Sequence, residues 1–284
     1  MPARRPRRRR PAARPADTAP ASRARPAAKA AVTPGTARPA TPSPRAIAFH
    51  AYVDRTRHPS VNLVFLMPWL FLYLVLFWTV GPEIENQAAS SLRAFLRLLG
   101  RRGLFVATLL TALALCAVVL VRLRVARHDV RVFNGMFVEG LLYGLALHGA
   151  AWGLSRLLPV GSWLGIGLVR APHGAEELRA LGVAIGAGIF EELLFRGGLT
   201  WALFRILKDV VGADRWSAGA VAVIASAFVF SAYHHWGVGG EPWDAVRFTF
   251  RFHAGALLGV VFLTRGLGIA AFAHGFYDAL VLLG

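Results

Sequence analysis

The first residues that could do chemistry are charged side chains inside a long apolar stretch, residues 178–207. A charge at bilayer depth costs at least about 2.5–3.5 kcal/mol on insertion scales, so such groups normally face a protein interior or a water-filled cavity. Glu192 and Arg196 are four residues apart, so a helix places their carboxylate and guanidinium on one face, where they can pair. Glu191 lies about 100° around that helix from Glu192 and can remain available as a general base.

Two histidines lie in later apolar stretches, each with a possible partner four residues away. Phe230 precedes His234, and Asp278 follows His274. A histidine whose second nitrogen is held by a carboxylate has a fixed tautomer, which suits a proton donor, an oxyanion binder or a metal ligand. The constellation could therefore work through a glutamate base without metal, or bind Zn²⁺ and activate its water. The candidate metal ligands are Glu191, His234 and His274.

The elements that must position these residues are apolar helices. Apolar residues make up 56% of the 284-residue chain, above the roughly 45–50% of soluble domains. Residues 61–80 and 103–121 contain no charged residue, and each is close to the ~20 residues that a helix needs to cross a bilayer. We predict an all-α, polytopic transmembrane helical bundle of about seven spans, with an amphipathic surface helix over residues 90–102. The remaining spans are expected near residues 133–158, 178–207, 216–236, 245–263 and 267–284.

The positive charge of the chain is concentrated at its N-terminus. Residues 1–46 hold eleven Arg, one Lys and one Asp, so they carry +11 of the formal +17. This segment lacks an apolar period, and we predict a disordered, cytoplasmic tail that precedes a transmembrane domain at residues 47–284. Its charge could attract anionic lipid or nucleic acid nonspecifically, but we expect no specific nucleic-acid partner. We expect an integral, multi-pass protein of the bacterial inner membrane.

In their order along the chain, these spacings resemble the CAAX prenyl protease and bacteriocin-processing (Abi, or CPBP) family of intramembrane proteases. The resemblance covers residues 178–284, whereas the N-terminal half is similar to the family only in being helical and hydrophobic. Each motif is weak alone, and their occurrence in order on successive apolar helices makes the resemblance specific. The motifs are Glu-Glu-x-x-x-Arg at Glu191 to Arg196, Phe-x-x-x-His at Phe230 to His234, and His-x-x-x-Asn/Asp at His274 to Asp278.

The resemblance implies an intramembrane endopeptidase that hydrolyses a peptide bond in a membrane-embedded or lipid-anchored substrate. Glu191 would activate the attacking water, and His234 would assist with its proton or its position. His274 and Asp278 would stabilise the oxyanion. The residues expected to support the site are Glu192, Arg196 and Phe230.

The family often has Asn where this sequence has Asp278. An ionised carboxylate cannot donate a hydrogen bond to an oxyanion, so we expect Asp278 to orient His274. The resemblance favours a mechanism without a cofactor, with Zn²⁺ as the alternative. Two competing functions remain: a non-catalytic membrane protein of the same fold, such as an immunity or assembly factor, and a transporter, because intramembrane carboxylates and histidines also build proton relays.

Overall fold

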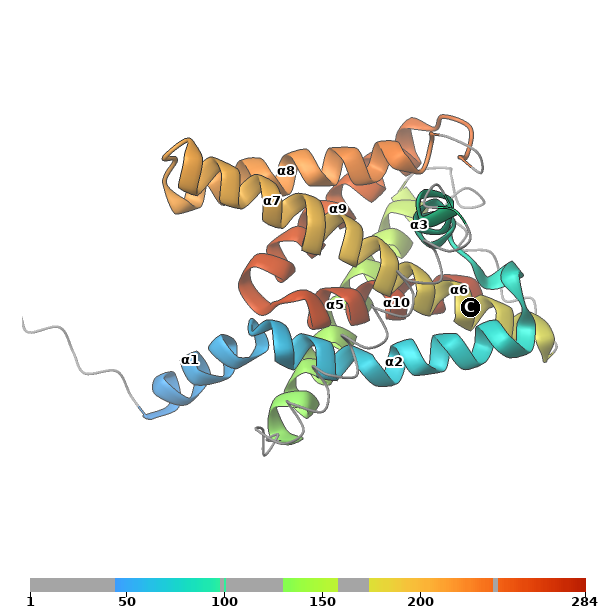
Figure 1. The fold of residues 1–284 in the computed structure, drawn as a ribbon, viewed down its shortest axis with the longest axis horizontal. Coiled ribbons are helices and arrows are strands. Elements are labelled where there is room, and N and C mark those ends of the chain that lie inside the picture. The colour runs from blue at the N-terminus through green and yellow to red at the C-terminus, as the bar shows by residue number, and fades with distance from the viewer. Residues whose placement is uncertain (1–43, 98–99, 101–129, 158–173, 237–239) are drawn as a thin grey trace, which may run out of the picture. The chain divides into compact units, whose positions relative to one another are not determined.

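Every regular element of the described chain is helical (Figure 1), which confirms the predicted all-α class. The structure, a computed structural model, describes residues 44–97, 100, 130–157, 174–236 and 240–284. The predicted tail up to residue 43 and the predicted span at residues 103–121 lie outside these ranges.

Four helices of the described chain are long and apolar enough to cross a membrane, and each coincides with a predicted span. The C-terminal helix α10 (Leu267–Leu283) is also apolar but shorter. The chain is therefore an integral membrane protein, and the count of about seven spans stays a prediction. The four long helices are α2 (Pro59–Val80), α5 (Val130–Leu157, with its apolar part at Val130–Gly153), α8 (Arg215–Tyr233) and α9 (Ala245–Arg265).

Shorter elements surround α2. The surface helix predicted over residues 90–102 corresponds to a helix that begins a few residues earlier. Asn86 precedes that helix, and its Oδ1 accepts a hydrogen bond from the Ala89 N–H at 2.8 Å. This contact satisfies one of the free N–H groups of the first turn and explains where the helix begins. The short elements are α1 (Pro44–Thr56), η1 (Pro82–Ile84) and α3 (Gln87–Arg97).

One continuous helical segment carries the first motif. π-Helical geometry is rare and occurs frequently at functional sites. Here it begins directly after Glu192, so the two glutamates end an α-helix and Arg196 lies in the π-helical stretch. The elements of the segment are α6 (Ala175–Glu192), π-helical η2 (Leu193–Thr200), α7 (Trp201–Arg205) and π-helical η3 (Ile206–Val210).

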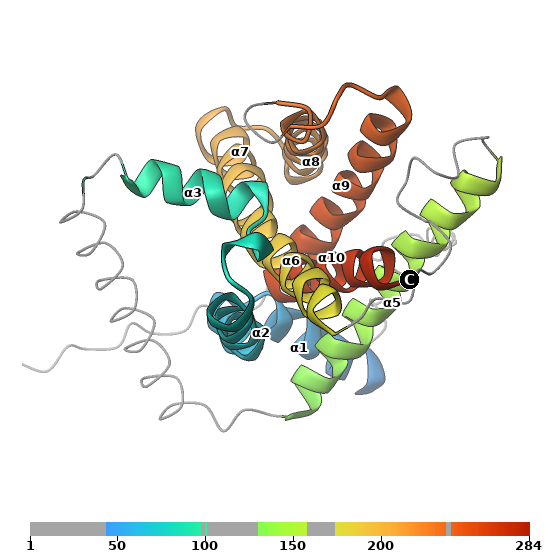
Figure 2. The same ribbon diagram turned by 90° about the vertical axis from the view of Figure 1, so that its right-hand side faces the viewer.

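Helices α6 and α10 cross in backbone contact (Figure 2). A Cβ atom added to Gly188 would lie 2.5 Å from the Ala271 carbonyl oxygen and 2.7 Å from the Gly275 nitrogen. Small residues permit such close approach between membrane helices. Because the two glutamates end α6 one turn after Gly188 and His274 precedes Gly275, this crossing brings the first and third motifs together.

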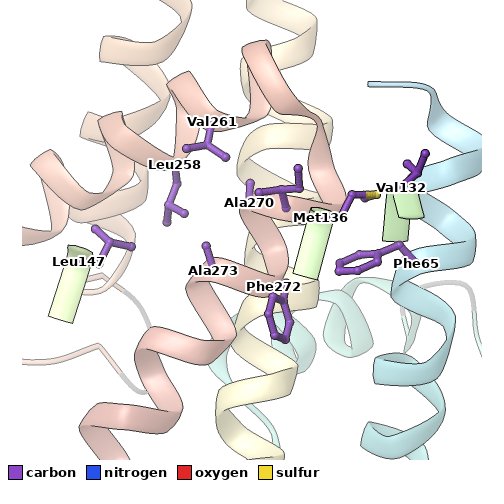
Figure 3. Close-up of a cluster of buried hydrophobic side chains, with 10 residues drawn as sticks. Phe65, Val132, Met136, Leu147, Leu258, Val261, Ala270, Phe272 and Ala273 are labelled. Carbon is purple, nitrogen blue, oxygen red and sulfur yellow. The ribbon is translucent and has the colours of Figure 1, made fainter. Parts of the chain in front are cut away.

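A buried apolar cluster holds α10 against α2, α5 and α9 (Figure 3). Met136 of α5 and Ile269 of α10 are completely buried. Lipid tails are as apolar as these side chains, so close van der Waals packing stabilises the contact more than transfer from water does. The cluster thereby fixes the helix that carries the third motif. Its members are Phe65, Val132, Met136, Leu147, Leu258, Val261, Ile269, Ala270, Phe272 and Ala273.

Candidate active site

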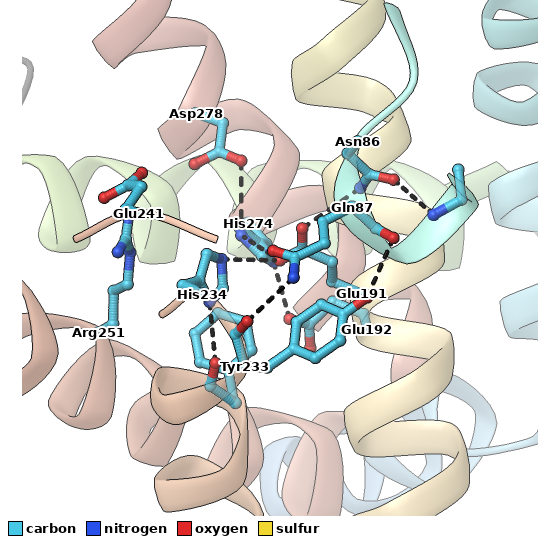
Figure 4. A network of polar contacts seen from close by, with 12 residues as sticks. Asn86, Gln87, Glu191, Glu192, Tyr233, His234, Glu241, Arg251, His274 and Asp278 are labelled. Carbon is cyan, nitrogen blue, oxygen red and sulfur yellow. Dashed lines mark hydrogen bonds and ion pairs between the residues drawn. The ribbon is translucent and has the colours of Figure 1, made fainter. Parts of the chain in front are cut away.

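The three motifs meet at one cavity of about 490 Å³ (Figure 4). Glu191 lies near the end of α6, His234 directly follows α8, and His274 lies in α10. Glu191 and His274 are buried, whereas the side chain of His234 is 19% exposed. Asp278 also lines the cavity. The structure therefore brings together the four residues that the sequence singled out for catalysis.

The two oxygens of the Glu191 carboxylate have different surroundings. Oε2 lies 3.6 Å from His234 Nε2 and 4.0 Å from His274 Nε2. Oε1 accepts a hydrogen bond from the side-chain Nδ2 of Asn86 at 3.3 Å. One oxygen is thus held by an amide, and the other faces both histidines.

The backbone fixes the tautomer of His234. Its Nδ1 lies 2.8 Å from the Phe230 carbonyl oxygen, which can only accept, so Nδ1 carries a proton. In the neutral ring the lone pair is then on Nε2, the atom that faces Glu191. The Phe230 ring packs against two other residues of the site. It contacts the His274 ring edge to face, and its centre lies 4.4 Å from the Arg196 guanidinium carbon.

His274 is held mainly by Glu192. Its Nδ1 lies 2.8 Å from Glu192 Oε1, whereas its Nε2 lies 3.5 Å from Asp278 Oδ2. Glu192 is thus a second carboxylate beside this ring, in addition to Asp278, which the sequence analysis expects to orient it. The backbone contact between α6 and α10 brings Glu192 against Nδ1, and this leaves Asp278 beside the nitrogen that faces the cavity.

Glu192 also forms the predicted ion pair with Arg196. Its Oε1 lies 2.8 Å from Arg196 Nη1, and the two side chains are 0% and 1% exposed. In addition to this ion pair, Arg196 Nη2 donates a hydrogen bond to the Gly255 carbonyl oxygen at 3.1 Å. Buried charges need such partners because desolvation is costly. One carboxylate oxygen therefore connects the buried arginine to His274.

Sequence reasoning missed the residues that come from the start of α3. Asn86 contacts Glu191, 105 positions away. Gln87 Nε2 donates to the carbonyl oxygens of Tyr233 at 3.1 Å and Trp236 at 2.8 Å, and the Tyr233 hydroxyl donates to the Gln87 carbonyl oxygen at 3.0 Å. These hydrogen bonds hold α3 against the end of α8. No local spacing in a single sequence indicates contacts at such separations.

Two arginines and a glutamate also line the cavity. Glu241, which lies between α8 and α9, accepts hydrogen bonds from Arg247 Nη1 and Arg251 Nη2, each at 2.8 Å. Partial burial by itself raises the pKa of the Glu241 carboxyl, but the hydrogen bonds from Arg251 and Arg247 outweigh it. They hold this pKa at about 2, below the usual 4.5. We refer to these three residues as the Glu241 cluster.

The residues considered as zinc ligands do not form a metal site in this structure. Within the described ranges, no group of three or more His, Cys, Asp or Glu side chains has a suitable arrangement. Zinc needs its ligand atoms at about 2.0–2.3 Å in a near-tetrahedral set. No step of the chemistry below therefore runs through a metal ion.

Residues 175–280 match the family model described as type II CAAX prenyl endopeptidase Rce1-like. The match includes all three motifs and confirms the resemblance for this part of the chain. The match begins well after α3, so Asn86 lies outside it. No curated protein and no solved structure matches the chain. Residues 175–280 of the helical membrane bundle are thus similar to a CAAX-type endopeptidase family.

Proposed function

We propose that the protein is an intramembrane endopeptidase that cleaves a membrane-embedded or lipid-anchored substrate, with Glu191 as its general base. The observation that carries this proposal is the position of Glu191 Oε2, which faces His234 Nε2 and His274 Nε2 in one cavity. A water molecule bound to this oxygen would lie within reach of both ring nitrogens. A general base needs this kind of contact with the proton that it removes.

In the first step, the water oxygen forms a bond to the carbonyl carbon of the substrate, and Glu191 Oε2 takes the water proton. The His234 Nε2 lone pair accepts a hydrogen bond from the same water and directs its attack. The carbonyl oxygen becomes an oxyanion. In the second step, the carbon–nitrogen bond breaks, and the leaving amine takes the proton from Glu191, which restores the carboxylate.

His274 stabilises the oxyanion in this scheme. Its Nδ1 proton is directed to Glu192 at 2.8 Å, so the ring orientation is set from the side away from the cavity. With a proton on Nε2 as well, the ring donates a hydrogen bond to the oxyanion. Preorganised donors of this kind stabilise the charge that develops in acyl transfer. Asp278, 3.5 Å from Nε2, supports that proton until the oxyanion forms.

Asn86 positions the base. Its amide cannot turn freely, because Oδ1 accepts the Ala89 N–H and thereby leaves Nδ2 directed at Glu191 Oε1. A hydrogen bond to one carboxylate oxygen restricts rotation of the whole group. Oε2 is then kept toward the two histidines, where the water would bind.

The proposed reaction needs no cofactor, and the proposed setting is the bacterial inner membrane with the N-terminus in the cytoplasm. The arginine-rich segment before the first span supports that orientation. Activity of the purified protein should survive dialysis against a zinc chelator. Loss of activity in the chelator, followed by recovery with added zinc, would contradict the metal-free mechanism.

The central test compares the wild-type protein with Glu191→Gln in lipid vesicles. Both are incubated with bacterial membrane proteins, and new peptide termini are identified by mass spectrometry. Gln keeps the size of Glu but cannot accept the water proton, so cleavage should fall by at least ~100-fold while the protein accumulates normally. Cleavage at the wild-type rate would refute Glu191 as the base. A wild-type protein that cleaves none of these substrates would favour the non-catalytic alternative.

A further inference from the structure

A second cavity, of about 250 Å³, lies between α2, α5, α6 and α10, and we refer to it as the apolar cavity. Every residue that lines it is apolar or glycine, from Leu66 on α2 to Ala279 on α10. Aromatic rings form one of its walls. The centre of the Phe272 ring lies 4.8 Å from that of Trp69 and 4.9 Å from that of Phe137. This lining suits a hydrocarbon and has no group that could neutralise a charge.

The apolar cavity and the cavity of the candidate active site lie on opposite faces of the same two helices. On α6, Ile189 lines the first cavity and Glu191 the second, and on α10 Phe276 and His274 are divided in the same way. Two positions along a helix correspond to about 200° around it. The two helices are in backbone contact at Gly188, and Figure 2 shows α2 and α8 on opposite sides of them. The helix pair therefore separates the two cavities.

The apolar cavity lies at membrane depth and reaches the surface of the bundle. Trp69 is near the middle of α2, and Leu141 is near the middle of the apolar part of α5, and both helices are candidate spans. Phe137 lines the cavity and is nevertheless 39% exposed, and Val138 beside it is 52% exposed. At this depth an exposed apolar side chain faces the hydrocarbon of the bilayer. The bilayer therefore has access to this cavity without passing the active site.

Bilayer hydrocarbon is the ligand that meets these conditions. Water does not fill an apolar cavity of this kind, and a cavity of ~150 Å³ with a similar lining takes up benzene. On that scale, the volume of about 250 Å³ has room for about ten carbon atoms. Lipid tails are already in an apolar medium, so the driving force would be the van der Waals contacts that an unfilled cavity forfeits.

We propose that the apolar cavity binds one acyl chain of a bilayer lipid, which enters beside Phe137 and packs against the aromatic wall. Such a chain lies behind the helix pair that carries Glu191 and His274, so it is not part of the substrate. The proposal does not depend on the proposed function. The same binding is expected in a protein that cleaves nothing.

The test is native mass spectrometry of the full-length protein, extracted from phospholipid vesicles in a mild detergent. A phospholipid should stay bound to the wild type. Ala279→Phe adds a phenyl ring, the size of benzene, to the wall of the cavity, so the lipid-bound fraction should fall by about tenfold. Ala220→Phe is the matched control, because Ala220 is exposed on α8 and lines neither cavity. Equal lipid-bound fractions in the wild type and both variants would overturn the proposal.

A measurement on the wild type decides the question even if Ala279→Phe does not fold. The protein is irradiated in vesicles whose phospholipid carries a diazirine near the end of one acyl chain, and the labelled residues are identified by mass spectrometry. The label should reach Ile185, which lines the cavity and is buried from the outer surface of the bundle. Labels confined to exposed residues such as Val221 and Phe228 of α8 would overturn the proposal.

Two results would assign the apolar cavity to a different occupant and would also overturn the proposal. A retained mass that corresponds to a lipidated peptide would assign it to a substrate. Cys116 is the only cysteine of the chain and lies in the predicted span at residues 103–121. A disulfide between Cys116 and the thiol introduced by Ala279→Cys would assign the cavity to that span.

Discussion

Two arginine–carboxylate clusters differ in their exposure to solvent: the Glu241 cluster lines the cavity, whereas the pair of Glu192 and Arg196 reaches it through the contact of Glu192 with His274. The side chains of Glu192 and Arg196 are 0% and 1% exposed, whereas that of Glu241 is 38% exposed. A buried pair has to be complete, since either partner alone is an uncompensated charge. A partly exposed pair is screened by water and stabilises the fold only weakly. Burial therefore decides which cluster must stay intact to form the site and which cluster can change its ion-pair partners.

The largest effect is expected for the buried cluster. Arg196→Met should lower the free energy of unfolding by about 3–5 kcal/mol, because Glu192 is left as a buried charge without its cation. Denaturant unfolding of the purified protein in detergent measures this. The control is Arg205→Met, which breaks an exposed pair with Asp209 at the same four-residue spacing and should cost less than about 1 kcal/mol. Equal losses in the two variants would remove the distinction between the clusters.

The next prediction concerns the helix crossing that brings Glu192 to His274. Gly188→Ala should destabilise the protein by about 1–3 kcal/mol, because the new Cβ meets backbone atoms that cannot move independently. Cleavage activity should fall as well. The control is Gly219→Ala, whose Cβ would lie at an ordinary 3.6 Å from Leu263 Cδ1. A stable, active Gly188→Ala protein would show that the buried cluster does not depend on this contact.

A smaller effect, on rate alone, is expected for Glu191. Its carboxylate is held by the uncharged amide of Asn86 and not by an arginine. Asn86→Ala should lower kcat by about tenfold, as expected for loss of a hydrogen bond to a charged group, with KM nearly unchanged. In the Glu191→Gln background the same change should have little further effect. Gln87→Ala loses contacts to the backbone of α8 but none to Glu191, and it serves as the control. Equal loss of kcat in both variants would indicate a general effect on α3.

The smallest effect is expected for the exposed cluster and depends on pH. The folded pKa of Glu241, about 2, is below its ordinary 4.5. The contribution of this carboxylate to stability is therefore complete above pH 4.5 and is lost as the pH falls toward 2. The difference in Tm between the wild type and Glu241→Gln should shrink between pH 5 and pH 3. A difference that stays constant over this range would mean that the ionised carboxylate contributes nothing.

Much of the architecture follows from local patterns, and much of the site does not. An uncharged run of about twenty residues indicates α2, and long, largely apolar stretches indicate the later spans, because a helix that crosses lipid must be predominantly apolar. The four-residue spacing indicates the pair between Glu192 and Arg196, because one helix sets their distance. The hydrogen bond from His274 to Glu192 depends instead on how two helices cross. Asp278, at the favourable spacing, lies 3.5 Å from one ring nitrogen, whereas Glu192, which no spacing indicates, contacts the other.

The hydrogen bond from Asn86 to Glu191 means that the matched region, residues 175–280, does not contain every group that arranges the candidate site. Residues 175–280 contain every residue of the three motifs, but the amide that fixes the Glu191 carboxylate comes from the segment before α3. The N-terminal part of the chain thus acts on the candidate active site as an activating subunit acts on its partner. A chimera that joins residues 175–284 to unrelated N-terminal helices would keep all three motifs and lose this control. Its carboxylate would be free to rotate.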